Sequence, residues 1–198
     1  MELTLDPNRR YTYADYLTWL DDKRRELWHG IVQLMTPAPN TAHQKVTGRL
    51  HGFIFNFLRK NNSKFPCEIF TAPFDVRFPE KGETDPKKIK TVVQPDLVIV
   101  CDKSKIDEHG CLGAPDLIVE VVSPRQGWRD AKQKFKLYEE YGVPEYWIVY
   151  PYEHTVHVFL LKDGKYQLEG IYTDRDKIPM RLFGGEFELD LAEVFEDV

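Results

Sequence analysis

The segment "APDLIVEVVSP", residues 114–124, constrains the fold more than any other part of the chain. It carries five large apolar residues in near succession, as a strand covered on both faces does: Leu117, Ile118, Val119, Val121 and Val122. A helix is expected over residues 128–141, ended by Gly142 with Pro144 beyond it, and "EYWIVY" then returns as a strand. Strand, helix and strand form a crossover unit, which predicts an α/β (α+β) fold with a central mixed β-sheet flanked by helices.

Elements on either side of this unit extend the sheet. "RELWHGIVQLM" predicts an N-terminal β-hairpin with its His-Gly pair at the turn, and a C-terminal β-hairpin is expected about Asp163-Gly164. Asn40 or Thr41 can cap a long helix that ends near Lys60. "CEIFTAPFDVRF" and "VVQPDLVIV" each predict a strand. A chain of 198 residues that is 42% hydrophobic can bury one good core, so residues 1–198 are expected to form a single domain.

The net charge of −5 counts against a protein that coats nucleic acid non-specifically. Basic residues nevertheless cluster at two places: Lys87, Lys88 and Lys90, and then Arg125, Arg129, Lys132, Lys134 and Lys136. The second cluster is either a solvated helix face or a local nucleic-acid contact, for which Arg125 and Arg129 are the candidates. The longest apolar run is far short of a membrane span, and the N-terminus lacks the layout of a signal peptide. A cytoplasmic protein without a membrane partner is therefore expected.

Three cysteines, Cys67, Cys101 and Cys111, are an odd number and include no C-x-x-C pair. This pattern suits a reducing compartment and argues against a disulfide framework. Cys101, His109 and Cys111 offer an alternative, a zinc site, but they are only three ligands scattered in a loop.

Glu120 interrupts the apolar strand, and a buried carboxylate must find a cation, bind a metal or become protonated. Asp116 lies four residues earlier on the same strand face, about 13 Å away, which is too far to share a metal ion. Asp96 begins or nearly begins the preceding strand, and a suitable register would bring it beside Glu120. Oxygen ligands of this kind favour Mg²⁺ or Mn²⁺ over zinc. We therefore predict a divalent metal site at Asp96 and Glu120.

A hydrolytic site of this kind also needs a positive group near the attacking water. Two residues after Glu120, on the same strand face, the chain has Val122 instead of a lysine. On the following helix Lys134 falls within the apolar arc, whereas Lys132 and Lys136 point away from it. Asp130, one turn earlier, could orient Lys134. The alternative is a buried Glu120–Lys134 salt bridge with no chemistry.

Pro95-Asp96 followed by Glu120 resembles the signature of the PD-(D/E)XK nuclease superfamily, the restriction-endonuclease-like fold. Longer segments are more specific, and they extend from about residue 11 to the C-terminus. In order, they resemble the Uma-two family, described as putative restriction endonucleases: "YTYADYLTWL", "ELWHGIVQLMTPAPNTAHQKV", "FDVRF", "QPDLVIV", "APDLIVEVVSP", "RDAKQKFKLYEEYGVPEYWIVYP" and the closing hairpin.

This resemblance implies a metal-dependent endonuclease that hydrolyses DNA phosphodiester bonds. The metal ligands would be Asp96, Glu120 and the carbonyl of Val121. Lys134 matches a lysine that the family carries on the helix, and it would be the catalytic lysine. Glu26 matches an N-terminal family glutamate that would complete the acidic cluster; the alternative for it is a surface carboxylate.

His43 matches a family histidine in the first turn of the long helix, and it would either contact a phosphate or pack beside Val46. Val122 departs from the superfamily pattern, which has a lysine at this position. Two other functions therefore stay open, namely a catalytically degenerate nucleic-acid-binding or regulatory module and a purely structural oligomer. Because many nucleases of this fold bring two sites to two strands, a homodimer is expected.

Overall fold

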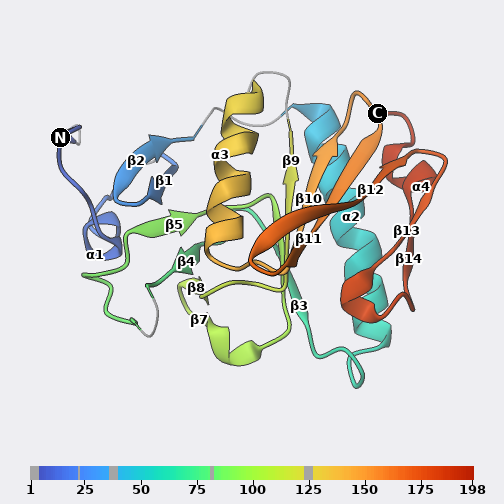
Figure 1. The fold of residues 1–198 in the computed structure, drawn as a ribbon, viewed down its shortest axis with the longest axis horizontal. Helices are drawn as coiled ribbons and strands as arrows, with labels where there is room; N and C mark the ends of the chain where they lie inside the picture. The colour runs from blue at the N-terminus through green and yellow to red at the C-terminus, as the bar shows by residue number, and fades with distance from the viewer. Residues whose placement is uncertain (1–4, 22, 36–39, 81–82, 123–126) are drawn as a thin grey trace.

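The computed structural model describes residues 5–21, 23–35, 40–80, 83–122 and 127–198, except for the side chains of residues 127–130. Within these ranges the chain forms two six-stranded sheets, a two-stranded sheet and helices packed against them (Figure 1). The prediction of an α/β fold with mixed sheets and flanking helices is confirmed. None of the helices in these ranges combines the length and the apolarity that a bilayer crossing needs.

The first sheet has the strand order β2-β1-β5-β4-β8-β7 and contains the N-terminal hairpin. Its strands are β1 (Arg25–Trp28), β2 (Ile31–Leu34), β4 (Val76–Phe78), β5 (Thr91–Val93), β7 (Ile106–Asp107) and β8 (Gly110–Leu112). The predicted turn is confirmed, since His29 and Gly30 both have positive φ, at 49° and 80°. Helix α1 (Tyr13–Tyr16) precedes this sheet, and the short 3-10 helix η1 (Lys103–Lys105) precedes β7.

The second sheet has the order β12-β11-β10-β9-β6-β3. Its strands are β3 (Glu68–Thr71), β6 (Leu97–Val100), β9 (Leu117–Val121), β10 (Glu145–Tyr150), β11 (Thr155–Lys162) and β12 (Lys165–Thr173). β9 and β10 are parallel and the other neighbours are antiparallel, as the predicted crossover requires. Every residue of β9 is buried, because the strand is central in the sheet and is covered on both faces.

Helices α2 (Thr41–Lys60) and α3 (Gly127–Glu140) cover opposite faces of the second sheet (Figure 1). Leu117, Val119 and Val121 pack in the cluster that includes α2, whereas Ile118 packs in the cluster that includes α3. The α3 cluster also contains residues of the first sheet, so α3 lies between the two sheets. The remaining elements are β13 (Lys177–Pro179), η2 (Arg181–Phe183), β14 (Glu188–Asp190) and α4 (Leu191–Phe195), and they pack on the α2 side.

Two segments that were each predicted as one strand are divided between the sheets. "CEIFTAPFDVRF" gives β3 in the second sheet and β4 in the first, and "VVQPDLVIV" gives β5 in the first and β6 in the second. Pro73 and Pro95 lie at the two crossing points, where the missing N–H cannot continue a sheet ladder. The Ala72 N–H donates to the Asp96 carbonyl at 3.2 Å, which joins the two crossings. The two sheets therefore meet where the chain bends beside Asp96.

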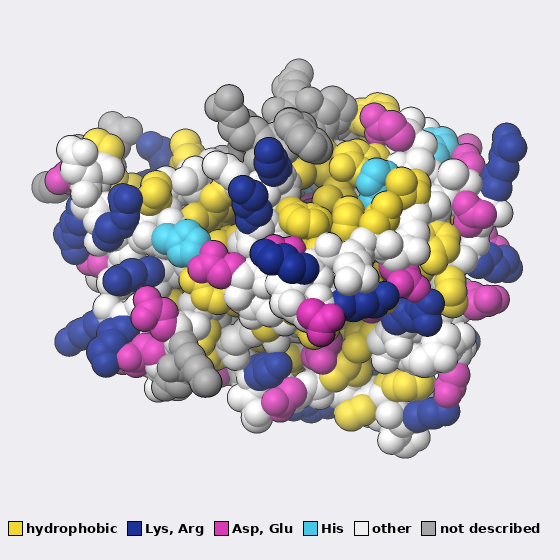
Figure 2. All heavy atoms as spheres, viewed as in Figure 1, with side chains coloured by type: hydrophobic (Ala, Val, Ile, Leu, Met, Phe, Trp, Pro, Cys, Tyr) yellow, Lys and Arg dark blue, Asp and Glu magenta, His cyan; other side chains and the backbone are white. Residues whose placement is uncertain are grey.

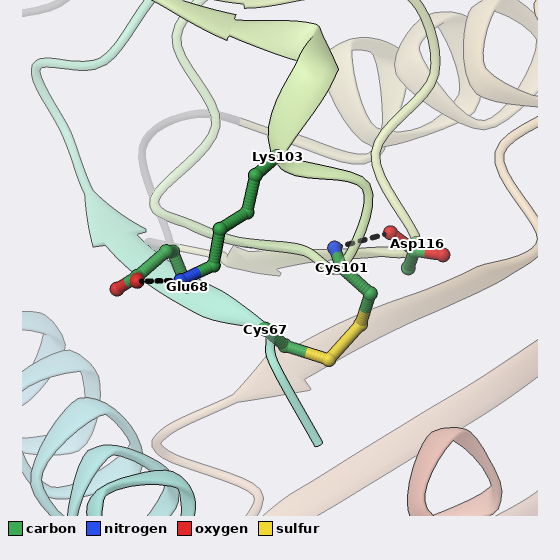
Figure 3. Close-up of a disulfide and its surroundings, with 5 residues drawn as sticks. All are labelled: Cys67, Glu68, Cys101, Lys103 and Asp116. Carbon is green, nitrogen blue, oxygen red and sulfur yellow. Dashed lines mark hydrogen bonds and ion pairs between the residues drawn. A yellow bond between two sulfur atoms is a disulfide. The ribbon is translucent and has the colours of Figure 1, made fainter. Parts of the chain in front are cut away.

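The prediction against a disulfide is wrong for Cys67 and Cys101, which are bonded to one another (Figure 3). Glu68 pairs with Val100 in the antiparallel ladder, so the two cysteines lie opposite each other just beyond the paired residues. A sequence separation of 34 residues hides this neighbourhood. Cys111 is a free, buried cysteine. The alternative zinc site at Cys101, His109 and Cys111 is also excluded by the disulfide, which uses the Cys101 sulfur.

Candidate active site

Asp96 and Asp116 occupy equivalent positions at opposite ends of the β6–β9 pair. Leu97 of β6 pairs with Val119 of the antiparallel strand β9, so Asp96, one residue before Leu97, lies opposite Glu120. Asp96 Oδ2 accepts the N–H of Val121 at 2.8 Å, and Asp116 Oδ2 accepts the N–H of Cys101 at 2.7 Å. Each aspartate therefore caps the end of the neighbouring strand. Asp116 lies at the disulfide end (Figure 3), and Asp96 lies at the end where the two sheets meet.

Glu120 points from β9 toward α3. Lys134 Nζ donates to Glu120 Oε1 at 2.9 Å, and the Tyr138 hydroxyl donates to the same oxygen at 2.6 Å. Glu120 and Lys134 are both buried. Burial raises the pKa of Glu120 to about 8; the positive charge of Lys134 opposes this rise, and the negative charges of Asp96 and Glu26 add to it. The inward direction predicted for Lys134 is present in the structure.

Glu26 reaches the same cluster from β1 in the first sheet. It is 3% exposed, so the alternative of a surface carboxylate is wrong. Its Oε1 accepts the backbone N–H of Gln94 at 2.8 Å, and its Oε2 accepts the indole N–H of Trp28 at 3.0 Å. Lys134 Nζ lies 3.5 Å from Glu26 Oε1, so one buried lysine stands between carboxylates from both sheets.

His43 approaches Asp96 from the first turn of α2. Asn40 caps this helix by accepting the His43 N–H at 2.9 Å. His43 Nε2 lies 3.1 Å from Asp96 Oδ2, and Thr47 Oγ1 lies 3.4 Å from His43 Nδ1. A carboxylate oxygen can only accept, so Nε2 carries the proton in this contact. His43 is buried, and the structure gives it the role of holding Asp96.

Asp96 opens onto a cleft of about 290 Å³. We call it the Asp96 cleft, and it is lined by Arg24, His43, Gln44, Thr47, Gly48, His51, Thr71, Ala72 and Asp96. The Asp96 side chain is 20% exposed, whereas Glu120 lies deeper. The cleft therefore gives solvent and solutes access to one side of the carboxylate cluster.

Some carboxylate oxygens of the cluster already accept hydrogen bonds from the protein, and others can still accept a ligand. Among the described residues, the donors that reach Asp96 and Glu120 bind Asp96 Oδ2 and Glu120 Oε1. Asp96 Oδ1 and Glu120 Oε2 are left as acceptors, whereas both oxygens of Glu26 are already bonded. Within the described ranges no group of three His, Cys, Asp or Glu side chains is arranged to hold a metal. Two carboxylate oxygens suit Mg²⁺, which keeps several of its waters when it binds a protein.

The family described as "Uma2: Putative restriction endonuclease" matches residues 13–192. The chain belongs to this family. A crystal structure of a putative nuclease belonging to DUF820 from Anabaena variabilis has a similar fold, with a TM-score of 0.71. That chain is 20% identical, and the match covers 93% of this Uma2 chain and 97% of the other. Among curated proteins, none matches this chain. Membership of Uma2 supports a nuclease function and a nucleic-acid substrate.

The Uma2 site also includes residues that the sequence did not single out. The Gln94 side chain donates from Nε2 to Asp75 Oδ1 at 2.8 Å and to the Tyr16 hydroxyl oxygen at 3.1 Å. Arg24 donates from Nε and Nη2 to Gln94 Oε1 at 3.0 and 2.8 Å. Burial raises the pKa of Asp75, and the hydrogen bonds from Gln94 and Tyr16 oppose the rise. The position of Gln94 directly before Pro95-Asp96 was the available signal, but an isolated glutamine carries little information.

Three of the predicted side chains of this Uma2 protein cannot be compared with the structure. Arg125 lies outside the described residues, and the side chains of Arg129 and Asp130 do as well. Lys132 and Lys136 are exposed on α3, as predicted, and Figure 2 shows Lys and Arg side chains over the outer face of this helix.

Proposed function

We propose that this Uma2 protein is a metal-dependent endonuclease that hydrolyses DNA phosphodiester bonds. The observation that carries the proposal is the convergence of Asp96 and Glu120, each with one oxygen left for a ligand, where the two sheets meet. Asp96 Oδ1 and Glu120 Oε2 would hold Mg²⁺ or Mn²⁺, and the Val121 carbonyl is the third candidate ligand. When bound, the ion lowers the pKa of a water and offsets negative charge on the phosphate.

Lys134 supplies the positive charge that the superfamily pattern places two residues after Glu120, where this chain has Val122. Its ammonium group is held beside Glu120 Oε1 and 3.5 Å from Glu26 Oε1. Lys134 would orient a water with this ammonium group while Glu120 and Glu26 hold it in the site. A fixed positive charge in a buried site also stabilises negative charge that develops on the phosphate. Glu26 and Tyr138 position this pair by fixing one partner each.

His43 and the Val121 N–H both hold Asp96 Oδ2, which aims Oδ1 away from them. A ligand whose second oxygen is fixed in this way loses less freedom when it binds a cation. His43 therefore acts on Asp96 as a positioning residue. A direct contact of His43 with phosphate stays a prediction.

The test is cleavage of plasmid and of single-stranded DNA by pure protein with Mg²⁺ or Mn²⁺. We expect cleavage by the wild type and its loss in Asp96→Ala and Glu120→Ala. Lys136→Ala, on the exposed face of α3, is the matched control and should retain cleavage. Absence of cleavage by the wild type, or equal cleavage by all variants, would reject the proposal.

A catalytically degenerate binding module is the second candidate, because Val122 replaces the usual lysine and Lys134 is already paired with Glu120. Calorimetric titration with Mg²⁺ or Mn²⁺ separates the two functions. A degenerate site binds neither ion, whereas an intact site binds one of them and loses it in Glu120→Gln. The expected homodimer is tested separately by light scattering of the protein as it elutes from a sizing column.

A further inference from the structure

A second pocket adjoins the Asp96 cleft on the side of the N-terminal hairpin. We call it the Trp19 pocket; it has a volume of about 280 Å³ and is lined by Tyr16, Trp19, Asp21, Lys23, Arg24, Arg25 and Gln94. Arg24 lines both this pocket and the Asp96 cleft. A molecule that extends from one to the other can therefore contact the Arg24 side chain in both.

Arg24 is a cation whose charge is not neutralised within the described part of the chain. Its side chain donates two hydrogen bonds to the neutral Gln94 Oε1, and the described residues place no carboxylate within ion-pair distance of it. Gln94 is buried, and its Nε2 is fixed by Asp75 and Tyr16, so its amide oxygen faces Arg24 in a set orientation. The guanidinium group is exposed but pre-oriented, which suits a bidentate contact with phosphate.

The rest of the Trp19 pocket is formed by aromatic side chains and by an ion pair between Arg25 and Asp21. Arg25 binds Asp21 through both of its terminal nitrogens, and its guanidinium lies 5.6 Å from the centre of the Trp19 ring. Trp19 is half-buried and is held edge-to-face by Tyr11 at 5.5 Å. Tyr16 contacts Trp19 as well, at 5.5 Å, so the ring is held by two tyrosines and by Arg25 while it lines the pocket. A fixed aromatic side chain in a pocket wall offers apolar surface to a flat ligand.

We propose that the Trp19 pocket binds the base of an unpaired nucleotide next to the scissile phosphate, and that Arg24 binds the phosphate joining it to the Asp96 cleft. The ligand is thus a single-stranded or locally unpaired DNA segment. This inference rests on the proposed nuclease function of the cleft. Stacking on an aromatic side chain requires an accessible base face, which a paired base shows only after it leaves the duplex stack.

The test measures binding without cleavage, in EDTA, by fluorescence anisotropy. The probes are a labelled oligothymidylate of about 12 nucleotides, within the range of single-strand site sizes, and a mixed-sequence duplex of the same length. Trp19→Leu keeps apolar bulk against Tyr11 but removes the flat ring, and should weaken single-strand binding about tenfold and duplex binding less than about twofold. Trp19→Phe retains a ring and should stay within about threefold of the wild type.

Arg24→Gln tests the phosphate contact through salt dependence. Loss of one contact with a single strand should reduce the slope of log affinity against log salt by about 0.7. The control is Arg175→Gln, an exposed arginine between β12 and β13, which should leave the slope unchanged. Absence of single-strand affinity in the wild type, equal losses for both probes in Trp19→Leu, or an unchanged slope in Arg24→Gln would each overturn the inference. This binding assay is independent of the cleavage assay with Mg²⁺ or Mn²⁺. Single-strand binding through Trp19 together with no cleavage in that second assay would support the binding inference and reject the nuclease function.

Discussion

Lys134 and Glu120 form a buried pair of ionisable groups that joins α3 to β9, with Nζ of the lysine 2.9 Å from Oε1 of the glutamate. Removing two charges from water costs free energy that their attraction often does not recover, so a buried pair is weak evidence for stability. An apolar pair would fill the same space between a helix and a sheet. The fold therefore does not require these charges, whereas the proposed metal site gives them a role.

Lys134→Met should abolish cleavage while leaving the metal ligands in place. Methionine keeps the apolar stem of the lysine but removes the donors, and loss of one fixed electrostatic group costs about 100-fold or more in rate. We expect Mg²⁺ affinity, measured by calorimetry, to change only a few fold. Lys136→Met is the matched control on the exposed face of the same helix. Retained cleavage in the Lys134 variant would show that another residue performs this step.

The equivalent positions of Asp96 and Asp116 provide a comparison within one strand pair. Each accepts one backbone N–H from the opposite strand, so Asp116→Asn should cost about 1 kcal/mol of unfolding free energy, and Asp96→Asn should cost more because Asp96 also binds His43. Asp96→Asn should in addition weaken Mg²⁺ binding more than about tenfold, a loss of at least about 1.4 kcal/mol. Asp116→Asn should leave that affinity unchanged, because it lies at the other end of the strands. Urea unfolding and calorimetry measure the two effects, and equal metal affinities in both variants would remove Asp96 from the site.

Much of the fold could be predicted because its signals are local. The capped helix after Asn40, the turn at Gly30 and the strand over residues 117–121 depend on neighbouring residues alone, and all three are present. The crossover to β10 follows from the order of elements. The division of two predicted strands could not be read in this way, because Pro73 and Pro95 mark a break but do not say which sheet follows.

The candidate site could be predicted where a charged residue stands in an apolar pattern. Glu120 in an apolar strand and Lys134 in an apolar helix face each needed a partner, and strand spacing excluded Asp116. Arg24 and Gln94 gave no such signal, since an exposed arginine and a single glutamine fit any surface. Their contact spans 70 residues and depends on the pairing of β1 with β5, which local patterns do not encode.

The stability of the metal-free protein should fall as the pH rises. The pKa of Glu120 is about 8 in the folded protein against 4.5 for an ordinary glutamate, so the folded state holds a proton that the unfolded chain releases. This contribution to the free energy of unfolding is complete below pH 4.5, the pKa of the glutamate in the unfolded chain, and it is lost as the pH rises through about 8. We expect a loss of at most about 2 kcal/mol between about pH 6 and about pH 8 in EDTA, measured by urea unfolding. Glu120→Gln should have a flatter dependence, and an identical slope in both proteins would assign the titration to other groups.

The disulfide should stabilise the protein without contributing to cleavage. Denatured but unreduced protein should contain one reactive thiol, from Cys111, and reduction should expose three. Because the bond closes a loop of 34 residues in sequence, the Cys67→Ser/Cys101→Ser variant should lose about 2 to 4 kcal/mol of unfolding free energy. Cleavage well below the melting temperature should be unchanged, since the bond lies at the Val100 end of β6 and Asp96 at the other. Three reactive thiols before reduction would show that the bond does not form in solution, whereas a loss of cleavage at full folding would show that the two ends of the strand pair are coupled.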